Sequence, residues 1–288
     1  MSQYLNILAE NNMPTVAEIR SGHFDGVEYS KNGRCTSVLW TVGDSSAKLA
    51  KSISSGDVDG SVVLYLEAGY FCPWMTRGCA AKSGNSKGKS PCLRTAGRLG
   101  MPTGQLAGLR RTLFYIHEEE NFMNQAVADF VSYCKSLVAE AGTLAEGKKL
   151  LVSVRLDGTS DIGQQWNPLR RRLEEAVLGM PIQPSFYEYT KNWKATLKVA
   201  AKDQPYSITL SRHENTTMDE VQQAISLGYC VAVVIDHTKA KPDTLWGIPT
   251  IDGDLSDYRP NDKAGHIVLL HAKGNMKADT TGFVVRSW

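Results

Sequence analysis

The chain has 288 residues, of which 42% are apolar and 22% are charged, and its net charge is +2. A chain of this length can bury a large core as one domain. Its mean hydropathy of -0.26 and its lack of a long apolar run exclude a membrane span. Six cysteines are too few for a disulfide scaffold, and the N-terminus has no basic start followed by an apolar core. We therefore expect a soluble cytoplasmic protein with reduced cysteines.

The first sixty residues form an irregular segment, with a short helix expected over 44–54 and turns at 32–33 and 59–60. Regular alternation of apolar patterns starts only after this segment. We therefore divide the chain into an N-terminal extension, 1–60, that packs on the main domain, and an α/β domain, 61–288.

Seven apolar runs of strand length follow, at 61–68, 112–117, 150–156, 185–189, 206–211, 230–236 and 266–272. Most are continuous rather than alternating, as in strands buried on both faces of a parallel sheet. Helical patterns lie between them: an apolar face over 121–141, an Asn167-Pro168 helix start, and a capping box from Thr217 to Glu220 with Gly228 as its end. The alternation predicts a βα-repeat fold, either a partial or complete (β/α) barrel or a doubly wound sheet, and we favour the barrel.

Positive charge is concentrated in one segment. Between Arg77 and His117 there are eight Lys or Arg residues and no acidic residue, whereas the rest of the chain has 24 basic against 30 acidic residues. Six of the eight belong to a cysteine-bearing loop expected over 72–100: Arg77, Lys82, Lys87, Lys89, Arg94 and Arg98. Such a block on an otherwise acidic protein predicts an anionic partner, a nucleic acid or a phosphorylated small molecule; the alternative is a solvated loop.

Three cysteines, Cys72, Cys79 and Cys92, share this loop. Thiolates are soft ligands, and three of them can hold an iron–sulfur cluster with one iron left open, with zinc as the alternative metal. The Cys-x6-Cys-x12-Cys spacing lacks the paired Cys-x2-Cys knuckles of a zinc ribbon. Three unligated cysteines remain the other interpretation. Cys134 and Cys230 lie within apolar patterns and are expected in the core.

Polar residues follow several of the expected strands, where both βα architectures bind their ligands. Asp157 and Asp161 could bind a ribose hydroxyl, orient a cation or act as a base, although Asp-Gly and Ser-Asp are also common in turns. The other candidates at strand ends are Ser160, Lys191, Arg212 and Lys273. The nearby GNSKGKS segment lacks the first glycine of a phosphate-binding loop and is not assigned that role.

The segments CPWMTRGC, CLRTAGR, VRLDGTSDI, FYEYTK, YSITLSRHEN, CVAVVID, IDGDLSDYRPND and AKGNMKADTTGFV resemble, in this order, a family of phage and plasmid proteins, the gene-product-88-like family. The resemblance runs from about Val62 to Val285. In that family the third cysteine follows the second more closely, so 80–91 looks like an insertion here. The family in turn resembles radical S-adenosylmethionine enzymes, which also place a three-cysteine loop after the first strand of a partial barrel, although the Cys-x3-Cys-x2-Cys spacing is absent. The resemblance implies S-adenosylmethionine as a second cofactor.

Two functions follow from these patterns. The first is a phage-type enzyme with an iron–sulfur centre on the three cysteines, acting on a nucleotide or nucleic acid in the host cytoplasm. In it, Asp157, Asp161, Lys191 and Arg212 are catalytic, Ser160 and Lys273 bind the cofactor, and the loop cations bind the anionic substrate. The second is a non-enzymatic phage module, with structural zinc or no metal, that binds nucleic acid or a host protein.

Overall fold

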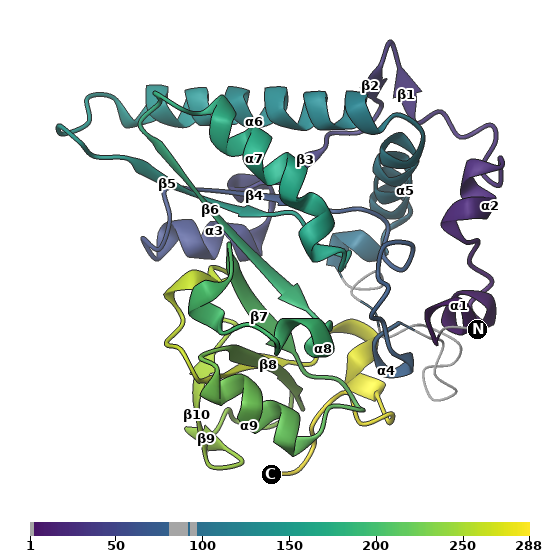
Figure 1. Cartoon of the computed structure of the whole chain (residues 1–288), viewed down its shortest axis with the longest axis vertical. Helices are drawn as coiled ribbons and strands as arrows, with labels where there is room; N and C mark the ends of the chain where they lie inside the picture. The colour runs from purple at the N-terminus through teal and green to yellow at the C-terminus, as the bar shows by residue number, and fades with distance from the viewer. Residues whose placement is uncertain (1–2, 81–91, 93–96) are drawn as a thin grey trace.

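The computed structural model describes residues 3–80, 92 and 97–288 and is built around a twisted, mostly parallel sheet (Figure 1). Nine strands of the described residues pair in the order β3-β4-β5-β6-β7-β8-β11-β10-β9, and all pairs from β4 to β10 are parallel. Their bounds are β3 Trp40–Val42, β4 Gly60–Leu64, β5 Leu150–Arg155, β6 Ile182–Thr190, β7 Ser207–Ser211, β8 Cys230–Ile235, β9 Thr244–Leu245, β10 Ile248–Asp252 and β11 Ile267–His271. A separate hairpin joins β1 Ser30–Lys31 to β2 Arg34–Cys35.

The ends of the sheet are antiparallel strands, β3 on β4 and β9 on β10. The expected α/β class with a parallel sheet is confirmed. In the part of the chain that the structure describes, no pairing between β3 and β9 closes the sheet into a complete barrel.

Alternate residues of the parallel strands face two different environments. Along β5, Val152 and Val154 pack into the main apolar core, whereas Ser153 and Arg155 face the other side of the sheet. The same alternation places Tyr187 and Tyr189 of β6 on the face with Arg155. One face is thus apolar and covered by helices, and the other carries buried polar side chains. This explains why the strand runs look almost continuously apolar and yet contain charged residues.

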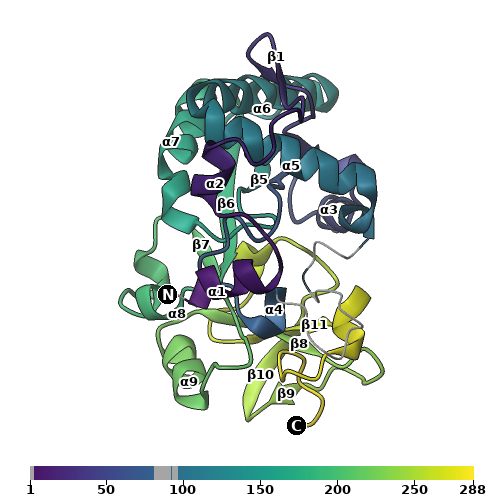
Figure 2. The same ribbon diagram turned by 90° about the vertical axis from the view of Figure 1, so that its right-hand side faces the viewer.

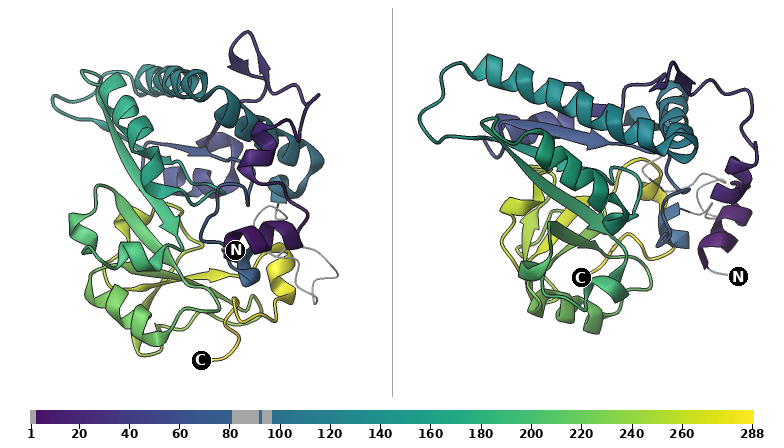
Figure 3. Two further views of the ribbon diagram at one scale, coloured as in Figure 1. Left: turned by 45° about the vertical axis from the view of Figure 1, so that its right-hand side comes forward. Right: turned by 45° about the horizontal axis from the view of Figure 1, so that its top comes forward.

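Helices cover the apolar face (Figure 3). Helices α5, α6 and α7 pack on β4–β6, and α9 packs on β7, β8 and β11. Thr217 caps α9 through the predicted capping box with Glu220, and Pro168 lies in the first turn of α7. The bounds are α3 Ala47–Ser54, α4 Arg77–Ala80, α5 Pro102–His117, α6 Glu119–Ala141, α7 Asn167–Ala176, α8 Trp193–Thr196 and α9 Met218–Ser226.

The strand expected over 112–117 is wrong, because these residues form the last turns of α5. Five of these six residues are half-buried or fully buried, packed against the main core on one side and the N-terminal segment on the other. The run therefore lacks the alternation of exposed and buried positions that marks a surface helix. Periodicity cannot distinguish a strand from a helix that is buried on nearly all sides.

The N-terminal segment lies along the side of the molecule that carries α4 (Figure 2). It contains α1 Gln3–Glu10 and α2 Val16–Arg20, and Ile7 and Leu8 of α1 pack against Met75 in the cysteine loop. Beyond these helices, β3 joins the main sheet, so part of 1–60 belongs to the sheet itself. None of the described helices is long and apolar enough to cross a bilayer.

Candidate functional site

A cavity of about 370 Å³ opens at the carboxyl ends of the parallel strands. Loops after β4 and β5 form one wall, the ends of β6, β7 and β8 form its floor, and the residues after β11 close the opposite side. This is the position at which parallel α/β folds bind ligands. The wall is held together by backbone hydrogen bonds between the two loops, from Gly158 N to Leu64 O (3.0 Å) and from Asp161 N to Phe71 O (2.7 Å).

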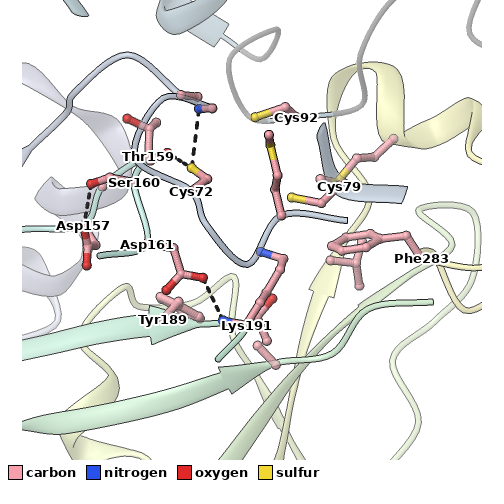
Figure 4. Close-up of a pocket in the computed structure, with 18 of the residues that line it drawn as sticks. Cys72, Cys79, Cys92, Asp157, Thr159, Ser160, Asp161, Tyr189, Lys191 and Phe283 are labelled. Carbon is pink, nitrogen blue, oxygen red and sulfur yellow. Dashed lines mark hydrogen bonds between the residues drawn. The ribbon is translucent and has the colours of Figure 1, made fainter. Parts of the chain in front are cut away.

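All three cysteines of the predicted metal site line this cavity (Figure 4). The Cys72 thiol donates to Thr159 O at 3.2 Å and accepts from Gly69 N at 3.4 Å. Burial, followed by the neighbouring Cys92, raises the pKa of Cys72 well above its ordinary value. Burial thus favours the protonated thiol of Cys72 over its thiolate, because the charged form loses its hydration.

The loop between Cys72 and Cys79 is anchored by Glu214, which lies after β7. Its carboxylate accepts hydrogen bonds from Gly78 N at 2.9 Å and from Thr76 Oγ1 at 2.8 Å. A Cβ atom at Gly78 would lie 2.5 Å from Glu214 Oε2, so only glycine allows this approach. Glu214 thus positions the helical turn that carries Cys79.

Asp157 is fully engaged within its own loop. Its carboxylate accepts from Ser160 Oγ (2.5 Å), Gly163 N (2.7 Å) and Trp166 Nε1 (3.0 Å). It is 2% exposed, so these three donors occupy the side chain. Asp157 and Ser160 both line the cavity, but their bonding identifies them first as the residues that shape the loop after β5.

Asp161 and Lys191 form the charged part of the cavity. The Asp161 carboxylate accepts from Thr190 Oγ1 (2.7 Å) and from the backbone N of Lys191 (2.9 Å). Burial raises the pKa of Asp161 to about 6, although Lys191 opposes the shift. Burial also works to lower the pKa of Lys191, but Cys79 and Asp161 outweigh it and raise that pKa. Figure 4 shows the Lys191 side chain extending toward the cysteines, with Phe283 beside it.

Of the other predicted residues, Lys273 lies in the cavity and Arg212 lies outside it. Lys273 lines the cavity and donates to Asp254 Oδ1 at 2.7 Å. Arg212 does not line it; its guanidinium donates to Gly282 O and Phe283 O and holds the C-terminal segment in place. Through Phe283, Arg212 supports a wall of the cavity without facing it.

Most of the predicted anion-binding residues lie outside the described residues: Lys82, Lys87, Lys89 and Arg94. The backbone of Arg98 belongs to a short 3-10 turn, Gly97–Gly100. Arg77 is exposed and pairs with Glu10 of α1. Arg111, which the charge count included, is 7% exposed and donates to Tyr65 O (2.7 Å) and Val38 O (2.8 Å). The positive segment of the sequence is therefore not one continuous surface.

Sequence reasoning missed two buried charged residues beside the cavity, Arg155 and Glu188. Arg155, at the end of β5, lines it and lies 3.6 Å from Asp257. Glu188 of β6 accepts from Asp157 N (2.9 Å) and from Arg170 Nη2 (2.9 Å). Burial and then Asp157 raise the pKa of Glu188 to about 8. A charged residue inside an otherwise apolar strand was the signal that could have identified Arg155 and Glu188.

The chemistry of the cysteine side chains suits a metal, although their positions do not form a set of metal ligands. Within the described residues, no three His, Cys, Asp or Glu side chains are arranged as metal ligands. The thiols nevertheless share one cavity and are soft donors, so the donor set fits a thiophilic metal.

The fold and the site define an α/β protein with a cysteine-lined cavity at the carboxyl ends of its parallel strands. The family model described as Gene product 88 matches residues 40–287, so the chain belongs to this family. The match confirms the resemblance found in the sequence and extends it to β3. No curated protein and no solved structure matches the chain.

Proposed function

We propose that this protein is a phage-type enzyme whose active site is the cysteine-lined cavity, with a thiolate-bound metal centre and a nucleotide or nucleic-acid substrate. The observation that carries the proposal is the convergence of Cys72, Cys79 and Cys92 on one cavity with the polar strand ends. Cysteines in unrelated structural roles would have no reason to meet there.

Iron–sulfur is the proposed centre, held by the three thiolates, and zinc is the alternative. Three thiolates can hold a cluster and leave one iron open to a ligand, which is the chemistry that the centre would supply. Metal binding would displace the thiol protons and draw the three side chains together. S-adenosylmethionine is the proposed second cofactor; its support is the position of Cys72 in the loop that follows β4, the first of the parallel strands of a sheet that we take as a partial barrel.

The proposal predicts that the three cysteines act as a unit. Replacing any one of them by Ser should abolish stoichiometric metal in anaerobically purified protein, because a hydroxyl is a poor ligand for a soft metal. Metal analysis and absorbance at roughly 400 nm, where iron–sulfur centres absorb, measure the effect.

Cys134→Ser is the matched control, because Cys134 is buried in the main core and does not line the cavity. Its metal content should equal that of the wild type. Equal metal in all four variants, or none in the wild type, contradicts a metal centre. Colourless protein with stoichiometric zinc would favour the non-enzymatic module.

A further inference from the structure

The cavity contains one cation whose charged end has no hydrogen-bonded acceptor among the described residues. Three cationic side chains line it. Arg155 lies beside Asp257 and donates to Asp157 O, and Lys273 donates to Asp254. Among the described residues the Lys191 ammonium has no recorded hydrogen bond or ion pair; the centroid of the Phe283 ring is 5.9 Å away, and Cys79 and Asp161 act on it electrostatically.

Asp161 does not fill this place. Its two carboxylate oxygens accept from Thr190 Oγ1 and from the backbone N of Lys191, so they are oriented toward the start of the Lys191 residue and not toward the end of its side chain. The ammonium instead extends into the cavity (Figure 4). An anionic ligand would give this ammonium a charge-assisted hydrogen bond that the described residues do not supply.

Apolar side chains form part of the wall of the cavity into which Lys191 extends. Phe283, Met75 and Met276 line the cavity and are each less than a tenth exposed. Ligand sites for small molecules have this composition: apolar walls that take up the body of the ligand, and a few polar groups that fix its orientation. The volume of about 370 Å³ is that of a site for one small molecule.

We infer that the Lys191 ammonium binds a phosphate or carboxylate group at one end of a small-molecule ligand, whose apolar body lies against Phe283 and the two methionines. This inference rests on the proposed function only in taking the cavity as the ligand site. It narrows the ligand to a small oxyanion-bearing molecule and assigns Lys191 the binding of its anionic group.

The test compares oxyanions with an uncharged counterpart by calorimetric titration. The probes are inorganic phosphate, acetate, AMP and adenosine. Wild-type protein should bind at least one of the two minimal oxyanions and should prefer AMP to adenosine. Lys191→Met should weaken oxyanion binding by about tenfold or more, because a hydrogen bond to a charged group is lost. Lys191→Arg keeps the charge and should retain most of the binding.

Lys194→Met is the matched control, because Lys194 is three residues away and exposed. It should bind every probe as the wild type does. Phosphate should also slow the reductive methylation of Lys191 in the native protein without slowing that of Lys194, which tests the contact even if Lys191→Met does not fold. The affinities of wild-type protein for phosphate and for acetate, compared in the same titration, show whether the site takes a phosphate or a carboxylate group.

Failure of wild-type protein to bind any oxyanion, equal binding by Lys191→Met, or unprotected Lys191 would overturn the inference. Metal content is measured on the same samples. Oxyanion binding through Lys191 in protein that contains no metal would contradict the metal centre and support this inference. Stoichiometric metal in protein that binds no oxyanion would support the metal centre and overturn this inference.

Discussion

Two aspartates four residues apart, Asp157 and Asp161, show what a sequence can and cannot say about single residues. Both follow β5, and their type and position predicted two catalytic carboxylates. The structure separates them, because three donors occupy Asp157, whereas Asp161 is next to Lys191 and the cysteines. The number of donors around a carboxylate depends on neighbours that a strand pattern does not specify. Asp161 is therefore the stronger candidate for proton transfer.

The raised pKa of Asp161 predicts a pH dependence of stability. Its ordinary value is 3.8 and its value in the fold is about 6. The folded state therefore holds the proton more tightly, so between pH 4 and pH 6 the unfolded state loses it first and the free energy of unfolding falls as pH rises. The fall should be on the order of 3 kcal/mol.

Asp161→Asn should remove this fall, so the difference in the free energy of unfolding between the variant and the wild type should change across pH 4–6. Urea unfolding at several pH values between 4 and 7 measures it. Asp262, whose pKa burial also raises to about 6, remains in both proteins and cancels in the comparison. Parallel pH curves for the two proteins would show that Asp161 titrates normally.

At the scale of elements, the sequence was most informative where a pattern had a local cause. The parallel strands other than β10 were found because apolar runs mark strands buried on both faces, and the start of α9 was found because its capping box is local. The edge strands β3 and β9, and β10 next to β9, were missed, since they are short or only half-buried. Glu214 could not have been assigned, because its partner Gly78 lies 136 positions away in the chain.

The hydrogen bonds of Glu214 predict that it rigidifies the cysteine loop. Glu214→Ala should leave Gly78 N and Thr76 Oγ1 without their acceptor and favour opening of the turn that carries Cys79. Because hydrogen bonds to a charged group are lost, the opened turn should become about tenfold or more populated. The alkylation rate of Cys79 should rise by the same factor. Mass spectrometry after timed iodoacetamide labelling measures this rate.

Glu174→Ala is the control, because Glu174 is exposed on α7 and distant in sequence from the loop. It should leave the labelling of Cys79 unchanged, and Cys134 should label slowly in all variants since it is buried. If Cys79 labels at the wild-type rate in Glu214→Ala, Glu214 does not hold the loop.

Over the whole molecule, the site is assembled from segments between Asn11 and Phe283, and yet its position was predictable. Parallel strands place their carboxyl ends at one edge of the sheet, so residues remote in sequence meet there by topology. The charge distribution was less predictable from composition. Arg111 is buried and Arg77 is paired with Glu10, so two of the eight counted cations serve the fold.

Four of the six remaining cations predict a salt-dependent interaction with a polyanion. Lys82, Lys87, Lys89 and Arg94 follow the cysteine-bearing turn without an acidic residue among them. Cations that neutralise phosphates release counterions, so binding should weaken steeply as salt is added. Replacing all four by Gln should flatten the dependence of log K on log salt by a slope of about 3 to 4, and base preference should not change, since phosphate contacts carry no sequence information. Filter binding to single-stranded DNA, double-stranded DNA and RNA at two salt concentrations measures both quantities.

Arg171→Gln on the exposed side of α7 is the control for a general loss of positive charge. Equal slopes for wild type and the quadruple variant, or no binding at low salt, would leave the cavity as the place where this protein meets an anion.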